Sequence, residues 1–441
     1  MKTFKIGGIH PPDNKLSADS AIRKAALPTH VVIMLNQHIG SPSEPIVSKG
    51  DEVKTGQLIA KASSFVSANV HSSVSGKVVK VDEALDASGY KHQAIYINVT
   101  GDDWMEDIDR SDNLERECDM VPSKIIERIT EAGIVGMGGA CFPTHVKLSP
   151  PKGKKAEVVI VNAVECEPYL TADHRLMIEK GEEILVGLTI LMKATQVKRG
   201  IIGVEANKKD AIDHLMKMAE PYEGIKILPL KVIYPQGGEK QLIEAAIGRR
   251  VPSGALPVDV GAIVQNVATV FAVYEAVQKN KPLFERVITM TGKNMSEPGN
   301  YLVRIGTPLS DFIDNEGGLP ANTAKVVFGG PMMGKAVSDL SVPITKGSSG
   351  LLAISEKDAP RKEVKNCIRC AKCVVACPMG LEPYLFMTLA ELEDWEKLEK
   401  ELIMDCIECW CCTYSCPSNR PLLDYLRIGK AKVGNIIKAR K

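Results

Sequence analysis

Two short runs near the C-terminal end of the chain decide its fold there: CIRCAKCVVACP (residues 367–378) and CIECWCCTYSCP (residues 406–417). Both fit the pattern C-x2-C-x2-C-x3-C-P, in which thiolates wrap an iron–sulfur cubane and the fourth cysteine binds the other cluster. The spacing therefore predicts two [4Fe–4S] clusters. The first would be held by Cys367, Cys370, Cys373 and Cys416, and the second by Cys406, Cys409, Cys412 and Cys377.

A pair of zinc sites is the alternative interpretation of these cysteines. Zinc ribbons use two separate cysteine pairs, whereas each run here has three cysteines followed by a Cys-Pro, so the spacing favours clusters. Cys411 is left over in the second run, and we expect it not to be a ligand. Between the runs, residues 381–402 carry Leu, Glu and Lys at helical spacing. We therefore expect residues 353–441 to form an α-helical dicluster ferredoxin domain.

The composition sets limits on the rest of the chain. Its 441 residues are too many for one ordinary core and indicate several domains. A net charge of +1 and 5% aromatic residues argue against a nucleic-acid-binding protein. No signal peptide is recognisable, and no apolar run reaches the ~18 residues that a membrane-spanning helix needs. We therefore expect a cytoplasmic protein, soluble or peripheral to a membrane. In such a protein the 12 cysteines, most of them clustered, favour metal binding over disulfides.

Residues 119–283 alternate between helical and strand-like segments. We expect helices at 123–132, 178–194 and 240–247, and strands at 157–161, 200–204 and 225–233. Strands that alternate with helices favour an α/β domain with a largely parallel sheet, here Rossmann-like.

Short β-rich runs fill two other parts of the chain, residues 1–118 and 284–352. In the first part, GDEVKTGQLI (50–59) and SGKVV (75–79) resemble the paired runs of the biotinyl/lipoyl barrel-sandwich fold. Carrier domains of that fold modify a lysine on the hairpin between these runs, but Lys61 comes too early and the tip reads Ser63–Val66. We therefore expect a barrel-sandwich hybrid that acts as a scaffold and not as a swinging arm.

A glycine-rich loop in the α/β region, GIVGMGGACFPTHVK (133–147), is a candidate phosphate site. Crowded glycines let backbone N–H groups approach a phosphate, and Lys147 adds a positive charge. By itself such a loop is often an ordinary turn. Further polar turns at 161–168 and 234–240 follow predicted strands, and the carboxyl ends of strands are where α/β sheets bind ligands.

Four motifs, in this order, resemble the FMN- and NADH-binding subunit of respiratory complex I: GMGGACFPTHVK, NAVECEPYLTADHR, YPQGGEKQLIEAAIGRRVP and VQNVAT. The next segment, TGKNMSEPGNYLVRIGTPLSDFI, is similar to the β-grasp (SLBB) domain that follows there. That complex I subunit, however, carries one cluster and lacks the N-terminal barrel. The start GGIHPPDNK, the barrel, GGPMMG and the dicluster domain together resemble the RnfC family of Rnf electron transport complexes, over essentially the whole chain.

The resemblance implies roles for individual residues. Residues matching the cradle of the FMN phosphate are Gly136, Gly138, Gly139 and Lys147, and others around FMN are Asn162, Tyr234, Asn266 and Thr269. Phe142 matches a ring that stacks on the NADH adenine, and Glu167 and Glu239 match carboxylates that hold NADH over the flavin. Val164 and Gly238 depart from the complex I pattern, which has an Asp and a Glu there.

The function that this resemblance implies is the electron-input subunit of an ion-translocating NAD:ferredoxin oxidoreductase. Such a protein would lie on the cytoplasmic side of the membrane, bind FMN and NAD(H), and pass electrons through its clusters to membrane and iron–sulfur subunits, and so indirectly to or from ferredoxin. Two alternatives stay open: a cobalamin-reducing flavoprotein of a microcompartment, and a flavin-free electron relay. For the basic tail 427–441 we expect a terminal helix, or a segment that docks to a partner or an anionic membrane.

Overall fold

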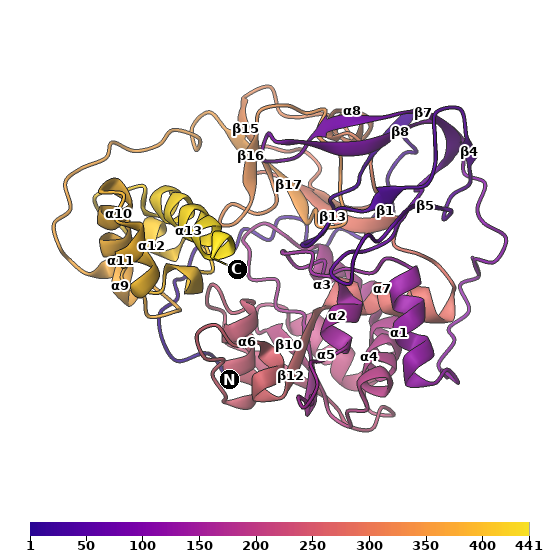
Figure 1. Cartoon of the computed structure of the whole chain (residues 1–441), viewed down its shortest axis with the longest axis horizontal. Coiled ribbons are helices and arrows are strands. Elements are labelled where there is room, and N and C mark those ends of the chain that lie inside the picture. Colours follow the sequence, from indigo (N-terminus) through magenta and orange to yellow (C-terminus); the bar gives the residue numbers. More distant parts are fainter. Residues whose placement is uncertain (441) are drawn as a thin grey trace.

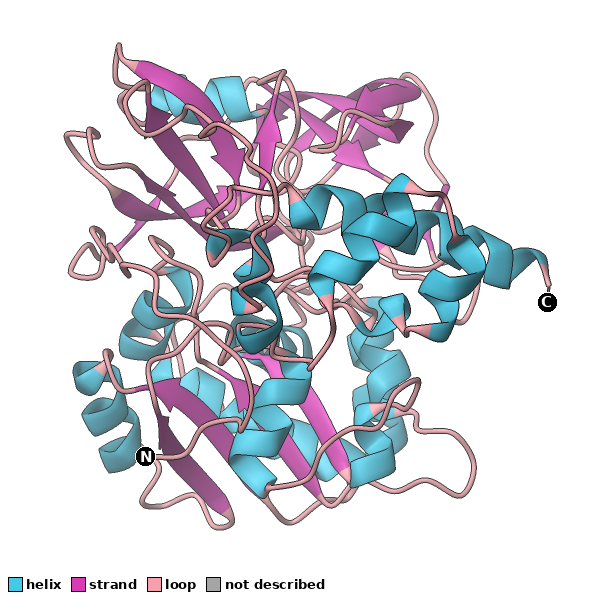
Figure 2. Cartoon of the chain, turned by 90° about the vertical axis from the view of Figure 1, so that its left-hand side faces the viewer, coloured by secondary structure: helices cyan, strands magenta, loops and turns pink. Residues whose placement is uncertain are grey.

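The computed structural model describes residues 1–440, so Lys441 of the basic tail lies outside the described residues. An α/β block occupies one side of the molecule and two β-sheet regions the other (Figures 1 and 2). The helical C-terminal module lies beside both (Figure 1). None of the helices in the described part is both long and apolar enough to span a membrane.

The α/β block is built on a parallel four-stranded sheet in the order β11 (Ile225–Leu230), β10 (Gly200–Glu205), β9 (Val158–Asn162), β12 (Ala262–Asn266). β9 and β10 are buried along almost their whole length, as expected for parallel strands covered on both faces. The helices of the block are α1 (Pro122–Glu131), α2 (Thr144–Leu148), α3 (Ala172–Glu179), α4 (Gly181–Thr195), α5 (Lys209–Met218), α6 (Glu239–Ile247) and α7 (Val267–Gln278), with a 3-10 turn at Pro257–Val260.

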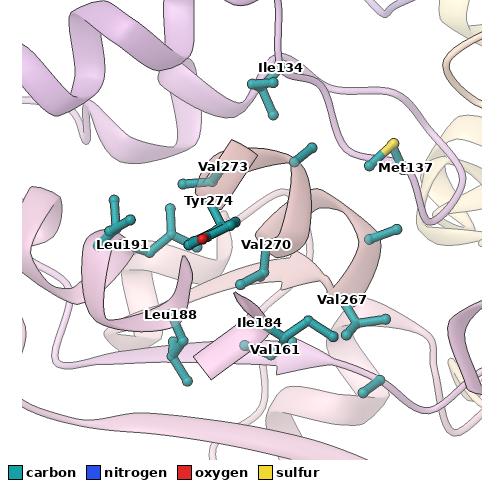
Figure 3. Close-up of a cluster of buried hydrophobic side chains, with 14 of the residues drawn as sticks. Ile134, Met137, Val161, Ile184, Leu188, Leu191, Val267, Val270, Val273 and Tyr274 are labelled. Atoms are coloured by element: carbon teal, nitrogen blue, oxygen red, sulfur yellow. The ribbon is translucent and has the colours of Figure 1, made fainter. Parts of the chain in front are cut away.

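The largest core of the molecule lies on one face of this sheet, where α4 and α7 pack together. Figure 3 shows Leu191 of α4 beside Tyr274 of α7, with Val270 of α7, Leu188 of α4 and Val161 of β9 in the same cluster. Met137, from the glycine-rich loop, belongs to the same buried cluster. The core therefore anchors the loop on which the candidate phosphate site depends.

Two sequence predictions in this block need correction. The helix predicted at 178–194 begins three residues later, as α4, because Lys180 has φ −133° and separates it from α3, which packs against β13 and β14. The strand predicted at 225–233 ends at Leu230. From there the chain pairs with the N-terminal segment, where the N–H of Lys231 donates to the Lys2 carbonyl at 3.0 Å.

Two regions of β structure form the side of the molecule away from the α/β block. The barrel-sandwich packs one sheet, β2 (His30–Met34), β8 (Lys91–Gly101), β7 (Ser75–Leu85), β4 (Glu52–Val53), against another, β3 (Glu44–Pro45), β5 (Leu58–Lys61), β6 (Val70–His71). The second region is a six-stranded mixed sheet with helix α8 (Leu309–Asn315), in the order β1 (Ile22–Lys24), β14 (Gly299–Arg304), β13 (Glu285–Thr291), β17 (Gly350–Ser355), β15 (Thr323–Phe328), β16 (Lys335–Val337).

The N-terminal segment ahead of β2 is not part of the barrel. β1 pairs in parallel with β14 of the six-stranded sheet, and Ile9 forms an antiparallel bridge with Tyr234 of the α/β block. The N–H of Gly8 donates to the Ala376 carbonyl of the helical module at 3.0 Å. A segment too short to form its own core satisfies its backbone groups on the edges of its neighbours, and here it ties three regions together. The domain limits given above remain predictions.

The helical module consists of α9 (Lys372–Val375), α10 (Pro383–Glu391), α11 (Trp395–Lys400), a 3-10 turn (Ile403–Asp405), α12 (Cys411–Tyr414) and α13 (Leu422–Ala439). The helical stretch expected at 381–402 is interrupted at Glu393, which has φ +55°, and Asp394 then caps α11. α10 and α13 pack against each other around one apolar core. α13 matches the terminal helix expected for the tail, in its described part.

Candidate functional site

The crevice of the α/β block lies where the strand order reverses. β9 leads to β10 and β11 on one side, whereas β12 pairs on its other side, so the carboxyl ends of β9 and β12 flank a topological switch point. Asn162 and Asn266 are register partners at those two ends. Open α/β sheets bind their ligands at such a point. The two predicted flavin residues are therefore brought together by topology.

The glycine-rich loop closes over this crevice. A Cβ added to Gly138 would lie 3.0 Å from the Cβ of Asn266, so the loop backbone lies directly against that side chain. The N–H of Met137 donates to Thr269 Oγ1 at 2.9 Å. Thr269 thus positions the loop through its hydroxyl, while Gly138 and Gly139 stay exposed. Exposed backbone N–H groups with no Cβ in front of them suit an anion such as a phosphate.

Charged residues of α2 and α6 meet beside β12. Lys147 Nζ donates to Glu239 Oε1 at 2.7 Å and to the Val264 carbonyl at 3.0 Å. A residue predicted to bind the FMN phosphate and one predicted to bind NADH therefore form an ion pair. Because the pair is partly exposed, a phosphate can compete with the carboxylate for the ammonium group.

The turn after β11 supplies polar groups that lack partners. Asn162 Nδ2 donates to the Gly237 carbonyl at 2.8 Å. Tyr234 is buried and its hydroxyl makes no hydrogen bond among the described residues, and the same holds for Nε2 of Gln236 and of Gln265. Buried polar atoms without a partner are costly. Together with the glycine-rich loop and Lys147, this set fits a ligand that carries a phosphate and several hydrogen-bonding edges, as FMN does.

Glu167 lies in a different setting from the one that the resemblance implies. Its carboxylate accepts hydrogen bonds from the N–H groups of Met332 (3.1 Å) and Met333 (2.8 Å), in the loop GGPMMG (329–334). Burial raises the pKa of Glu167 to about 7, against those two hydrogen bonds. The loop of the six-stranded sheet therefore holds the side chain predicted to hold NADH.

Two residues that shape this turn, Lys15 and Asp173, were not predicted as site residues, although both lie in the motifs quoted above. Lys15 is half-buried, and its Nζ donates to the carbonyls of Glu165, Glu167 and Leu170 at 2.7–2.9 Å. Asp173 accepts from Asn266 Nδ2 at 2.7 Å, and burial raises its pKa to about 7. Lys15 ends the motif GGIHPPDNK, but only the folded chain brings it to the turn.

The barrel supports the glycine-rich loop from outside. His145 of α2 forms a hydrogen bond through Nε2 with the Phe65 carbonyl at the barrel's hairpin tip (2.9 Å), and the two rings pack edge to face. The N–H of Ile39 donates to the Cys141 carbonyl at 3.3 Å. Phe142, predicted to stack on adenine, is half-buried next to these contacts. A hairpin tip engaged in this way acts as a support, in line with the expected scaffold.

The second cysteine set lines one cavity. Its walls include all four cysteines predicted for the second cluster, Cys377 from the first run and Cys406, Cys409 and Cys412 from the second, together with apolar residues such as Leu423. Cys377 therefore lies with the other run, as the crossed pattern predicts. Burial raises the pKa of Cys406 to about 11, so iron must displace its proton on binding.

The first cysteine set lies at the surface. Cys367 and Cys370 are exposed, and Cys373 and Cys416 are half-buried. The N–H of Lys365 donates to the Ser418 carbonyl at 2.9 Å, which holds the start of the first run beside the end of the second. Within residues 1–440, no three His, Cys, Asp or Glu side chains converge at the distance that one metal ion needs. A cubane does not require this, because its four cysteines bind four different irons.

Both runs adopt the same backbone shape. Arg369 and Ala371 have φ of +54° and +56°, and their counterparts Glu408 and Trp410 have +56° and +66°. The N–H of Arg369 donates to Cys367 Sγ, and that of Glu408 donates to Cys406 Sγ, both at 3.4 Å. Left-handed conformations are costly for residues other than Gly, about 1 kcal/mol each or more. This repeated geometry turns backbone N–H groups toward sulfur, as a cluster loop requires.

An apolar junction joins the second cysteine set to the crevice. Cys409 and Cys411 form one buried cluster with Tyr234, Met332, Ile9 and Ala376, and Cys166 packs against it. The thiol of Cys411 donates to the Tyr234 carbonyl at 3.9 Å. The residue after β11 that is predicted to lie near FMN therefore contacts the cysteine segment of the second cluster.

Comparisons with known proteins agree with this architecture. Family models match residues 2–102 (RnfC barrel sandwich hybrid domain), 129–275 (Nuo51 FMN-binding domain) and 287–336 (SLBB domain). The subunit designated C in the proton-translocating ferredoxin:NAD(+) oxidoreductase complex of Clostridium ljungdahlii is 46% identical, over 98% of this chain and 94% of the relative. The chain belongs to the RnfC family.

Two further members of the RnfC family are also similar to the chain over almost its whole length. The equivalent protein in the Na(+)-translocating ferredoxin:NAD(+) oxidoreductase complex of Acetobacterium woodii is 43% identical, over 98% of this chain and 97% of the relative. The equivalent protein in the ion-translocating oxidoreductase complex of Rhodobacter capsulatus is 39% identical, over 98% of this chain and 84% of the relative. A chain of an NAD+-reducing [NiFe]-hydrogenase in its H2-reduced state has a similar fold, with a TM-score of 0.50, 18% identity, and coverage of 71% of this chain and 63% of that one.

Proposed function

We propose that the chain is the electron-input subunit of an ion-translocating ferredoxin:NAD(+) oxidoreductase complex, bound at the cytoplasmic side of the membrane. The observation that carries the proposal is the junction at Tyr234 and Cys411, which puts the candidate flavin crevice in direct contact with the second cysteine set. A two-electron site that touches a one-electron site is what NAD(H)-linked electron transfer needs. Membrane and iron–sulfur subunits of the same complex are the partners, with ferredoxin linked through them.

The crevice residues divide the work of binding. When bound, FMN supplies the conversion between hydride transfer and single-electron transfer. Gly138 and Gly139 offer backbone N–H groups to its phosphate, and Lys147 adds a positive charge. Gly136 shapes the loop instead, because its own N–H donates to the Phe142 carbonyl at 2.9 Å. Asn162, Tyr234 and Asn266 line the space beyond, and Thr269 holds the loop in place.

The two acidic residues orient the dinucleotide, with Phe142 under its adenine. Glu239 becomes available when Lys147 turns toward a phosphate, because the two are now paired. Glu167 becomes available only when loop 329–334 releases its carboxylate. Binding of NAD(H) is thus linked to the position of that loop.

The two clusters act in a fixed order. The second set, Cys406, Cys409, Cys412 and Cys377, is next to the crevice. The first set, Cys367, Cys370, Cys373 and Cys416, opens to the surface. A cluster held by the second set would therefore be placed to exchange electrons with a flavin in the crevice, and one held by the first set to exchange them with partner subunits.

Anaerobic purification followed by an absorbance spectrum and iron counting tests the proposal. We expect flavin absorbance that bleaches on addition of NADH, and about eight irons per chain. A protein that binds no flavin even after FMN is added, and is not bleached by NADH, would be a flavin-free relay. Oxidation by a corrinoid faster than by any protein acceptor would favour a cobalamin reductase.

A further inference from the structure

The segment that carries the first two cysteines is open to solvent along its whole length. It joins β17 to α9 and runs as a long loop around the outer side of the helical module (Figure 1). Every residue from 360 to 372 is exposed. This includes Cys367 and Cys370, which are two of the four ligands proposed for the first cluster. We call residues 360–375 the outer strip.

The outer strip presents apolar side chains that nothing covers. Ile368 is 67% exposed and Val364 is 52% exposed. Val375, one turn further on in α9, is 75% exposed. Single exposed apolar residues are ordinary, but three within twelve residues, on either side of redox ligands, are what the apolar centre of an interface would need.

The strip is also strongly basic. Its basic residues are Arg361, Lys362, Lys365, Arg369 and Lys372, and its one acidic residue is Glu363. Within the described chain, Arg361 pairs with Asp424 at 3.1 Å, but the other four make no ion pair. Unpaired cations around an apolar centre attract an acidic surface and speed its approach.

We propose that the outer strip is the docking surface for an acidic redox protein or subunit that exchanges single electrons with the first cluster. This inference rests on the proposed function and adds the surface through which electrons pass between the chain and its partner. In each encounter one electron moves between the reduced centre of one protein and the oxidised centre of the other, with no bond made and no proton transferred. A bound partner also shields the exposed ligands from water.

Stopped-flow mixing of the full, cofactor-loaded chain with a reduced acidic ferredoxin, used as the probe, tests this inference. The test variant is K362E/K365E, which changes two exposed strip residues that are not ligands. The control is K432E/K438E, which makes the same charge change on exposed residues of α13. We expect the test variant to lower the second-order rate constant about tenfold at low salt, and the control to change it less than about twofold.

Further measurements keep the outcome clear. Iron content and the cluster EPR signals must match the wild type, and the rate of flavin bleaching by NADH must be unchanged in both variants. Equal effects of the two variants, or none from K362E/K365E, would overturn the proposal. Loss of binding to anionic vesicles with an unchanged ferredoxin rate would assign the strip to a membrane surface instead. If NADH fails to bleach the wild type, the proposed function fails, but the ferredoxin rates still test the docking surface.

Discussion

The two cysteine runs share one motif and one backbone shape, yet the structure gives them opposite surroundings. In the second run the cysteines line an apolar cavity, and the acidic Glu408 is neutralised by Arg427 at 3.2 Å and Lys430 at 3.0 Å. In the first run two cysteines are exposed, and Arg369 and Lys372 have no ion-pair partner in the described chain. This difference teaches that the spacing of the cysteines determines which cluster a run can bind. The burial and charge of the surrounding side chains determine which electron donor or acceptor that cluster can reach.

Exchange of the fourth ligand is the sharpest test of how the runs cooperate. Replacing Cys377 of the first run, C377A, should abolish the second cluster, because Cys377 lines the cavity of the second set. Iron content should fall from about eight toward about four per chain, with the EPR signal of the first cluster retained. C411A is the matched control and should keep both signals. Loss of the first cluster alone in C377A would break the crossed assignment.

The difference in exposure predicts a difference in lability. When the loaded protein is treated anaerobically with an iron chelator, the first cluster should decay severalfold faster than the second, since Cys367 and Cys370 are exposed whereas Cys406 and Cys409 are buried. EPR spectra taken over time would separate the two. Equal decay rates would mean that the exposed run is shielded in the protein as isolated.

The buried surroundings of the second run include the apolar junction, and Glu167 binds the loop that brings Met332 into it. Burial raises its pKa from 4.5 to about 7. The folded state therefore favours the protonated form, and stability falls as pH rises from about 4.5 to about 7, by about 3 kcal/mol in all. E167Q should lack this fall and be more stable than wild type at pH 8, as measured by urea unfolding.

A surface glutamate serves as the control for that experiment. Glu127 of α1 is half exposed and pairs with Lys124, so E127Q should keep the wild-type pH dependence. If the stability of E167Q changes with pH as that of the wild type does, Glu167 does not have the raised pKa on which this prediction rests.

Removing one cation close to each run gives the smallest expected effect. Lys430 Nζ donates to the Cys406 carbonyl at 2.6 Å and pairs with Glu408, so K430Q should lower the reduction potential of the second cluster. K372Q, at an exposed site, should lower that of the first cluster by less, because solvent screens the charge. Redox titration followed by EPR would measure both. If the reduction potential shifts more in K372Q than in K430Q, solvent does not screen the charge of Lys372 as expected.

Much of the candidate site could be predicted from local patterns. The glycine-rich loop, the polar turns after β9 and β11, and the two cysteine runs all lie where their sequences indicated, because each depends on residues close together in the chain. What local patterns did not indicate are contacts made over long distances. Lys15 reaches the turn at Glu165–Leu170, and loop 329–334 binds Glu167. Both segments belong to motifs that indicate the family, GGIHPPDNK and GGPMMG, but neither motif indicates which distant residue it contacts.

The sequence by itself determined the ligand spacing of the two runs, the alternation of helix and strand, and the paired motifs of the barrel, because these depend on local geometry and periodicity. Only the tertiary structure decided that β1 joins a sheet outside the barrel, that Asn162 and Asn266 meet at the switch point, and that one run is buried while its twin is exposed. Burial is a property of packing between distant segments. Two runs with the same spacing can therefore end in opposite environments.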